Sequence, residues 1–335
     1  MLFENIPLAC GSGGRLTSEL IKEIFLKNFS NEHLRDLEDS AVLNLDSRNI
    51  AFTTDSYVVN PLFFPGGNIG KIAVCGTVND LSVKGAVPLF ISCGFIIEEG
   101  FPLETLKKIV LSMKKAAEDA KVKIVTGDTK VVERGKADKL FINTSGVGVF
   151  GKNSALNQKN IKPGDYIIVN GDLASHGIAV LNARNNLGIK GDIKSDCAPL
   201  NELIHKCVLP YNPSSVRDAT RGGLGMILNE AALSCGYCIE IDEDSLPVST
   251  PVKSACDMLG IDPIYAANEG KAVIFISEKS AKNALNSMRK HKYGKKSAII
   301  GKVSSKRGGK VWIKTSIGAE RMITMPEGEQ LPRIC

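Results

Sequence analysis

Two stretches in the first half of the chain space their apolar residues as amphipathic helices do. The first contains Leu16, Leu20, Ile21, Ile24 and Phe25, and the second contains Leu103, Leu106, Ile109, Val110, Met113 and Ala117. Recurrence at intervals of three and four residues places such side chains on one helix face. Short β-branched or apolar runs predict strands near residues 51–54, 90–97, 123–126 and 140–149. The first half therefore predicts alternating helices and strands.

A polar stretch at residues 152–160 separates this half from a second half of similar style. There we predict helices near 223–234 and 281–289, and strands near 166–169, 237–241, 272–276, 298–300 and 310–313. Because 335 residues exceed what one hydrophobic core usually organises, two domains are expected. The sequence thus predicts an α/β (α+β) protein with domains at 1–150 and 151–325 and a flexible tail at 326–335.

Composition narrows the function classes only modestly. The formal net charge is +6, and the densest basic cluster, at residues 289–296, contains a single aromatic, Tyr293, so we interpret it as a solvated helix end rather than a nucleic-acid surface. No stretch is long and apolar enough to cross a bilayer, and the N-terminus lacks signal-peptide features. Nine scattered cysteines indicate reduced thiols. We expect a cytoplasmic protein that binds neither nucleic acid nor membrane.

The last residue, Cys335, places a thiol beside the α-carboxylate of the chain. Chain ends are usually mobile unless they are tied down, so a thiol there could move between an external donor and an internal site. A carrier thiol requires that reach, although a frayed terminus that happens to end in Cys is the alternative. Cys235 and Cys238 have thioredoxin-like spacing without a second pair for zinc, and we interpret them as small buried side chains.

Two nucleotide-binding signatures fail when they are read residue by residue. Residues 66–71 resemble a P-loop, but Pro65 stands where the first glycine is needed and Ile72 stands where Ser or Thr is needed. Residues 146–151 match G-x-G-x-x-G after a strand but open onto a polar linker rather than a helix, which removes the helix N-terminus that would hold a pyrophosphate. Neither a Walker A nor a Rossmann site is predicted.

Five aspartates stand singly at strand ends or in small-residue turns: Asp39, Asp55, Asp80, Asp128 and Asp218. Each alone could be an N-cap or turn residue. Together they match the oxygen ligands that Mg²⁺ prefers, since this ion usually bridges a few carboxylates to substrate phosphates. Asp218 and Arg221 also flank a helix start at Gly222 and Gly223, where an anion could meet the guanidinium group and the helix N-terminus.

Five short segments, four of which contain one of these aspartates, carry a resemblance to a known family: Thr53-Thr54-Asp55-Ser56, Cys75-Gly76-Thr77-Val78-Asn79-Asp80, Thr126-Gly127-Asp128-Thr129-Lys130, Arg217-Asp218-Ala219-Thr220-Arg221-Gly222-Gly223 and Ala267-Asn268-Glu269-Gly270. They resemble the ATP-site segments of the aminoimidazole ribonucleotide synthetase-like (PurM-like) superfamily. The resemblance covers essentially the whole chain, and the ending Pro-Arg-Ile-Cys at 332–335 narrows it to the HypE family of hydrogenase maturation factors. It implies a two-domain PurM-like fold whose N-terminal sheet domains pair in a homodimer, with the nucleotide site near that interface.

The resemblance also implies an activity. Members of the HypE family receive a carbamoyl group on the terminal cysteine from the partner carbamoyltransferase HypF and use ATP to dehydrate it to a thiocyanate. The cyanide passes to iron held by the HypC-HypD complex, for the active site of [NiFe] hydrogenase. Carried onto this sequence, the resemblance makes Cys335 the carrier, Glu269 the general base, and Lys130 the cation near the carboxamide oxygen; the last two could instead exchange roles or only contact the nucleotide.

The same resemblance implies the ligands of ATP and Mg²⁺. Asp55, Asp80 and Asp218 are the preferred metal ligands, with Asp39 and Asp128 in reserve. The remaining predicted nucleotide contacts are Asn79, Thr126, Gly127, Arg221, Gly222 and Gly223. Two other functions stay open from the sequence. One is a kinase or synthetase of the same superfamily that acts on a free small molecule, and the other is a non-enzymatic thiol carrier with structural aspartates.

Overall fold

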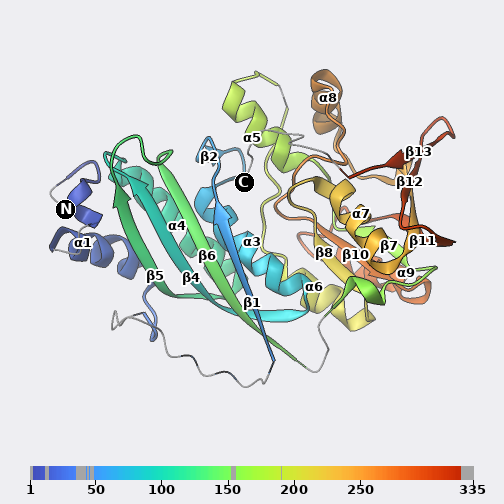
Figure 1. The fold of residues 1–335 in the computed structure, drawn as a ribbon, viewed down its shortest axis with the longest axis horizontal. Coiled ribbons are helices and arrows are strands. Elements are labelled where there is room, and N and C mark those ends of the chain that lie inside the picture. Colours follow the sequence, from blue (N-terminus) through green and yellow to red (C-terminus); the bar gives the residue numbers. More distant parts are fainter. Residues whose placement is uncertain are drawn as a thin grey trace.

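The computed structural model describes residues 3–11, 15–34, 43, 45, 49–151, 156–189 and 191–325. Asp39, Cys335 and the rest of the predicted tail at 326–335 lie outside these residues. The described chain contains two large β-sheets with flanking helices (Figure 1), which confirms the predicted α/β class. One sheet uses residues 50–150 and the other uses residues 166–323. The exact domain boundaries stay a prediction.

The first sheet has the strand order β1-β6-β4-β5. Its strands are β1 (Ile50–Tyr57), β4 (Ala86–Glu98), β5 (Lys123–Val132) and β6 (Leu140–Phe150), and only the β4–β5 pair is parallel. Helices α3 (Ile69–Val83) and α4 (Leu103–Ala120) pack on one face, while the other face carries no described helix (Figure 1). That open face leaves Ile50, Phe52 and Ile96 exposed to solvent.

Three short segments complete the first half. A 3₁₀ turn η1 (Leu8–Gly11) is followed by α1 (Arg15–Leu20), which continues through a π-helical turn (Ile21–Leu26) into α2 (Lys27–Phe29), as the apolar spacing predicts. Strands β2 (Phe63–Phe64) and β3 (Gly67–Asn68) form a small hairpin before α3. The Asn68 side chain accepts a hydrogen bond from the Lys71 amide at 3.0 Å and so caps α3. The sequence pattern predicted α4 but not α3, because 13 of the 15 residues of α3 are buried and no polar face remains.

The second sheet has the order β13-β12-β9-β11-β7-β10-β8. Its helix α7 (Gly223–Cys235) packs on one face, and α6 (Asn201–Cys207) and α9 (Glu278–Arg289) pack on the other. Helices α5 (Ser175–Asn185) and α8 (Thr250–Leu259) pack against each other. The strands are β7 (Tyr166–Val169), β8 (Ser215–Asp218), β9 (Tyr237–Asp242), β10 (Ala272–Ile276), β11 (Ala298–Arg307), β12 (Val311–Lys314) and β13 (Glu320–Ile323), and the 3₁₀ turns are η3 (Gln158–Asn160), η4 (Leu209–Tyr211) and η5 (Glu243–Ser245).

The two halves share a hydrophobic core. The cluster that fills the first half also contains Val180, Cys197 and Ala267 from the second half. Beside it, the buried Asn79 of α3 donates to the Ala198 carbonyl at 3.1 Å and to the Glu269 carbonyl at 3.4 Å, and it accepts from the Leu200 amide at 2.8 Å. One side chain of the first half therefore satisfies three backbone groups of the second.

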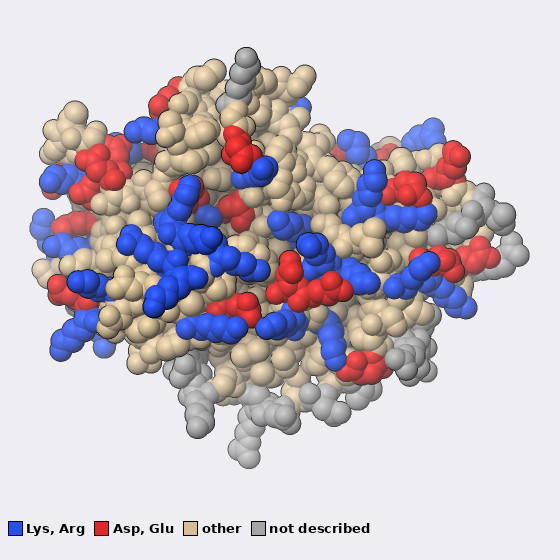
Figure 2. Space-filling model, turned by 180° about the vertical axis from the view of Figure 1, so that it is seen from behind, with Lys and Arg blue, Asp and Glu red and all other residues tan. Residues whose placement is uncertain are grey.

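The basic cluster at 289–296 lies where the sequence predicts it, at the end of α9 and in the turns that follow. Arg289 donates to the Ser297 carbonyl at 3.0 Å, and Lys292 lies over the Tyr293 ring. Figure 2 shows both acidic and basic side chains on the face of the molecule that is hidden in Figure 1. Among the described helices, none is long and apolar enough to cross a membrane.

Replacing Asn79 by Ala tests the contact between the halves. We expect the free energy of unfolding to fall by about 2–4 kcal/mol, because three buried backbone groups lose their partner. The matched control is Asn229→Ala in α7, whose buried amide bonds only the Gly225 carbonyl of its own helix, at 2.8 Å. Urea unfolding of both variants is the measurement. Equal losses in the two variants would show that Asn79 does not join the halves.

Candidate active site

A cavity of about 420 Å³ lies where β1 and α3 of the first half meet β8 and α7 of the second. Five of the predicted site residues line it, namely Asp55, Asp80, Asp218, Arg221 and Glu269. The other residues that line it are Thr54, Ser56, Tyr57, Gly76, Arg217, Thr220, Met226, Ile227 and Glu230. The sequence segments that resemble an ATP site are thus brought together in three dimensions, except for 126–130.

Strand β1 presents alternate side chains to α3 and fixes the first two carboxylates. Thr53 donates from its hydroxyl to Asp80 Oδ2 at 2.8 Å, and the Tyr57 hydroxyl donates to Asp55 Oδ2 at 2.8 Å. Gly76 of α3 makes room for Tyr57, because a Cβ at this position would lie 2.2 Å from the tyrosine oxygen. Each aspartate therefore has one hydroxyl donor that sets its orientation.

The third carboxylate, Asp218, is the last residue of β8 and directly precedes the turn into α7. Gly222 and Gly223 in that turn have φ values of 73° and 58°, a left-handed conformation that favours glycine. A Cβ at Gly223 would also lie 2.5 Å from the Ile264 carbonyl oxygen. These two glycines therefore have a clear backbone role, and they bring the N-terminus of α7 to the cavity beside Arg221.

The aspartates repel one another. Burial, and then the negative charge of Asp218, raises the pKa of Asp80 from its ordinary 3.8 to about 7. Burial also raises the pKa of Asp218, and Asp55 adds to that increase. The nearest cation, Arg217, lowers both pKa values but is itself paired with Glu230 at 3.0 Å. The cavity thus holds more negative charge than its own cations neutralise, which suits a bound cation.

Glu269 is 3% exposed and lies in a tight bend before β10. Burial, and then the neighbouring Cys197 and Asp196, raises the pKa of Glu269 well above its ordinary range. A raised pKa makes the ionised carboxyl group a stronger base than an ordinary carboxylate, and such shifts are common at catalytic acids and bases. It is the candidate general base of the site.

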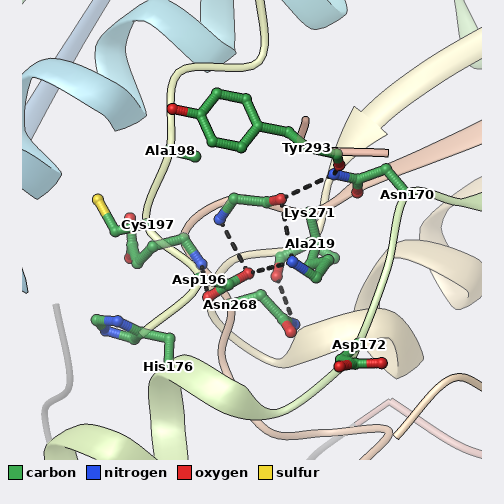
Figure 3. A network of polar contacts seen from close by, with 12 residues as sticks. Asn170, Asp172, His176, Asp196, Cys197, Ala198, Ala219, Asn268, Lys271 and Tyr293 are labelled. Carbon is green, nitrogen blue, oxygen red and sulfur yellow. Dashed lines mark hydrogen bonds and ion pairs between the residues drawn. The ribbon is translucent and has the colours of Figure 1, made fainter. Parts of the chain in front are cut away.

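The bend is fixed by a buried polar network (Figure 3). Asp196 accepts from the Glu269 and Gly270 amides, each at 3.1 Å, and forms an ion pair with Lys271 at 2.9 Å. Both charged side chains are 8% exposed. Burial acts to raise the pKa of Asp196, but the charges of Lys271 and His176 and these hydrogen bonds bring it below its ordinary value. Asp196 is therefore held ionised and positions the backbone that carries Glu269.

Three asparagines extend this network on either side of the bend. Asn268 donates to the Ala219 carbonyl at 2.9 Å and accepts from the Ala174 amide at 2.9 Å. Asn170 donates to the Gly270 carbonyl at 3.0 Å and accepts from the Ala272 amide at 2.8 Å. Asn79 holds the Glu269 carbonyl from the opposite half. Because Ala219 follows Asp218, the network also links the third aspartate to the bend.

Three of the four predicted residues of β5, namely Thr126, Asp128 and Lys130, lie on the other face of the first sheet, whereas Gly127 lies on the face of Asp55. The register aligns Ser56, Asn143, Gly94 and Asp128 in one cross-strand row, and it aligns Asp55, Thr144, Cys93 and Gly127 in the next. Aligned residues share a sheet face and adjacent rows alternate. Thr126, Asp128 and Lys130 therefore project from the open face, three strand spacings or about 14 Å from β1.

Other predicted residues have different surroundings from those expected. Asn79 does not line the cavity, and its amide bonds the backbone groups described above. Gly127 needs its lack of a side chain, since a Cβ there would lie 2.3 Å from the Cys93 carbonyl oxygen. Cys235 and Cys238 contact different backbone carbonyls, and no described group of three His, Cys, Asp or Glu side chains is close enough to hold a metal ion by itself.

Sequence reasoning missed several residues of the site. Tyr57 directly follows the Thr53–Ser56 segment, and Lys271 directly follows Gly270, so their positions in the chain could have suggested them. Asp196 lies 73 residues before Glu269 and belongs to no segment of the resemblance. Only the fold reveals its role.

Comparison with known proteins agrees with this arrangement. Residues 37–150 and 162–314 match the family models for the N-terminal and C-terminal domains of AIR synthase related protein. The carbamoyl dehydratase HypE of Escherichia coli (strain K12) is 46% identical in an alignment of 336 positions that covers 99% of each chain. A crystal structure of hydrogenase maturation protein HypE in complex with ATP has a TM-score of 0.95 at 44% identity and covers 98% of this chain and 100% of its own.

A chain from the crystal structure of a HypE-HypF complex is also similar. It has a TM-score of 0.81 at 50% identity and covers 92% of this chain and 99% of its own. Both family models and the nearly full-length similarity indicate the same family. This chain belongs to the AIR synthase related protein family and, within it, to the HypE group.

Proposed function

We propose that this protein is an ATP-dependent carbamoyl dehydratase that converts an S-carboxamide on its own Cys335 into a thiocyanate. The observation that carries the proposal is a buried carboxyl group, Glu269, at a cavity that is also lined by the aspartates of three separate elements, Asp55, Asp80 and Asp218. The relatives named carbamoyl dehydratase HypE and the HypE structure with ATP support it. The chain ends in the thiol that such a reaction modifies.

The chemistry explains why a buried base and a nucleotide are both required. Hydroxide is a very poor leaving group from an amide carbon, and ATP supplies a phosphoryl group that lets the oxygen depart as phosphate. Phosphorylation of the amide oxygen releases ADP and one proton of the amide nitrogen, and forming the C≡N bond then removes the second proton as the carbon–oxygen bond breaks. The oxygen ends in inorganic phosphate, so the chain loses the elements of one water. Glu269 would take a proton from nitrogen within this dry site.

The donor set of the cavity fits Mg²⁺ that is shared with a triphosphate. We propose Asp55, Asp80 and Asp218 as its ligands, because their carboxylates lack sufficient countercharge. The described residues hold no ready-made cluster of three ligands, and Mg²⁺ usually binds through one or two carboxylates together with phosphate oxygens. When bound, the ion would neutralise charge on the phosphates. Arg221 and the N-terminus of α7 would face the same anion.

We also propose that the protein is a homodimer in which a second copy completes the site. The cavity reaches both faces of the edge strand β1, since Thr54 and Ser56 line it from the open face and Asp55 and Tyr57 line it from the α3 face. A second sheet packed on the open face, with its β5 beside β1, would bring Asp128 and Lys130 of the second copy to this rim. The exposed Phe52 and Ile50 would then be covered.

The proposed partners follow from the reaction. A carbamoyl donor must load Cys335, and the HypE-HypF complex among the similar structures supports HypF in that role. We propose that the cyanide passes to iron on the HypC-HypD complex; infrared spectra without a cyanide band after mixing would contradict this.

We propose a cytoplasmic location because none of the eight described cysteines forms a disulfide. Recovery of the protein in an oxidising compartment would contradict it.

Replacing Asp80 by Asn tests the electrostatics of the metal site. Because the pKa of Asp80 is raised, the folded protein keeps a proton that the unfolded chain loses, and the stability that this gives at low pH is lost as pH rises from 3.8 to about 7. The variant should therefore be more stable than wild type at pH 7, by up to about 4 kcal/mol, with the gap closing toward pH 4. Thermal unfolding across this pH range is the measurement.

The same Asp80→Asn variant should respond less to Mg²⁺ when it binds ATP. Calorimetry with Mg²⁺ and with a chelator measures this response in both proteins. The matched control is Asp138→Asn, an exposed carboxylate in the turn between β5 and β6. If wild type binds ATP equally well with and without Mg²⁺, the proposed metal site is wrong.

Replacing Glu269 by Gln tests the proposed reaction. After loading by HypF and addition of ATP, intact mass spectrometry of wild type should show gain of a carbamoyl group and then loss of one water. Glu269→Gln should gain the carbamoyl group and bind ATP but lose water at least 10²-fold more slowly, a typical cost of losing a general base. Glu240→Gln on β9 should behave as wild type, and Cys335→Ala should show neither mass change.

Other outcomes of that experiment would favour the alternatives. ATP consumption by Cys335→Ala with phosphate transfer to a free small molecule would indicate a kinase or synthetase. Carbamoyl loading without any ATP binding would indicate a thiol carrier. Unchanged water loss in Glu269→Gln would remove this residue from the mechanism.

Mixing two inactive variants tests the shared site. Lys130→Ala and Glu269→Ala should each fail to dehydrate, but subunit exchange should create mixed dimers in which one of two sites is intact. Random pairing in a twofold dimer then restores about a quarter of the wild-type rate. Recovery of no activity, with exchange verified by mass spectrometry, would show that Lys130 acts within its own chain.

A charge placed on the open face should prevent the mixed dimers. Phe52 is 67% exposed, and Phe52→Glu should give a monomer by light scattering and abolish the rescue. Met258→Glu on α8, at a position 76% exposed, is the matched control and should remain dimeric.

A further inference from the structure

The last described strand, β13, is tied by residues on both sides of the buried Ile323 to a single segment of the chain. Arg321 donates to Asp262 Oδ2 at 3.0 Å, and the Tyr265 hydroxyl donates to the Thr324 carbonyl at 2.9 Å. Strand β13 lies at the edge of its sheet and pairs with β12 alone among the described strands. These two bonds therefore fasten the end of a strand that the sheet holds from one side only.

The segment that receives β13 also leads to the active site. Tyr265 packs on α7 so closely that a Cβ at Gly225 would lie 2.6 Å from its ring, and the Gly225 amide donates to the Ile264 carbonyl at 2.9 Å. The next residue of α7, Met226, lines the cavity. Four residues after Tyr265, the chain reaches Glu269. One tyrosine thus contacts the root of the C-terminal tail and the helix that lines the catalytic cavity.

We propose that Tyr265, with the Asp262–Arg321 pair, is a positioning residue that clamps the root of the tail beside the cavity and so raises the local concentration of the modified Cys335 there. This inference rests on the proposed dehydratase function. The Tyr265 hydroxyl takes no part in the proposed dehydration, and its role would be structural. The tyrosine ring packs in the core of the second half, whereas its hydroxyl holds a carbonyl of the exposed Thr324.

The length of the tail sets the size of the effect. Cys335 is eleven residues beyond Thr324, and a random coil of that length would have a root-mean-square span of about 17–20 Å. Without the clamp, β13 would be free to leave the sheet and the tail would begin near Lys314, with 21 residues. Effective concentration falls roughly as the −3/2 power of linker length, which gives about a two- to threefold loss.

The testing variant is Tyr265→Phe with Arg321→Gln, which removes one hydroxyl and one charge and leaves the Asp262 turn intact. Hydrogen exchange should become faster at the amides of residues 322–324. Single-turnover dehydration of the HypF-loaded protein should slow two- to threefold, whereas the KM for ATP should not change. General damage to the cavity would change both constants. The matched control is Tyr166→Phe, which removes a hydroxyl that contacts Glu278 at 3.4 Å, far from the tail root in the sequence and outside the catalytic cavity.

Each outcome decides one of the two proposals. If the double variant exchanges its 322–324 amides as slowly as wild type, or dehydrates at the wild-type rate, the clamp is wrong. If wild type itself loses no water after loading, the proposed dehydratase function is wrong. The exchange data would in that case still decide whether Tyr265 and Arg321 hold β13. Tyr265→Phe alone, the more conservative change, should show the same exchange effect in smaller degree.

Discussion

The active-site bend depends on one buried carboxylate, Asp196. It accepts hydrogen bonds from the amides of Glu269 and Gly270 and pairs with Lys271, so an ionised group fixes the backbone of Glu269, the proposed general base. The bend has no room for a larger residue, because a Cβ at Gly270 would lie 2.1 Å from the Asp196 carbonyl oxygen. A buried ion pair gives little net stability compared with apolar packing. This pair instead fixes the position of the bend, and Asp196 also raises the pKa of Glu269.

The site concentrates negative charge that folding alone does not favour. Asp55, Asp80, Asp218 and Glu269 come from four separate elements, and repulsion among them contributes to raised pKa values at three of these groups. The surrounding core and the Asn79 hydrogen bonds must offset this cost, because they hold the two halves at the distance where the carboxylates face one cavity. A bound cation would relieve the repulsion by neutralisation, whereas a polyphosphate adds negative charge and would have to be accompanied by that cation.

How much the sequence predicts depends on the kind of signal. The amphipathic α4 follows from its apolar spacing, whereas the buried α3 has no polar face and gave no periodic signal. Motif resemblance correctly identified Asp55, Asp80, Asp218 and Glu269 as neighbours in space. It did not show that Asp128 projects from the opposite face, because a strand reverses its side chains at every residue and only the register fixes the face. Asp196 and Tyr265 act through contacts between distant segments, for which a single sequence carries no local pattern.

The edge position of β1 is what allows the site to be both enclosed and shared. A strand inside a sheet has neighbours on both sides, so a cavity can reach only one of its faces. At an edge, the cavity reaches around the strand, and here it contacts Asp55 and Tyr57 on one face and Thr54 and Ser56 on the other. The carboxylates can then be buried against α3 while the rim stays open on the apolar face near Phe52. In the proposed dimer, a strand from a second copy would close this rim. Its Lys130 would add a positive charge to a cavity in which carboxylates outnumber cations. Among the described strands β1 pairs with β6 alone, and the proposed dimer would cover both this edge and the apolar face beside it, which would keep the edge from pairing with unrelated strands.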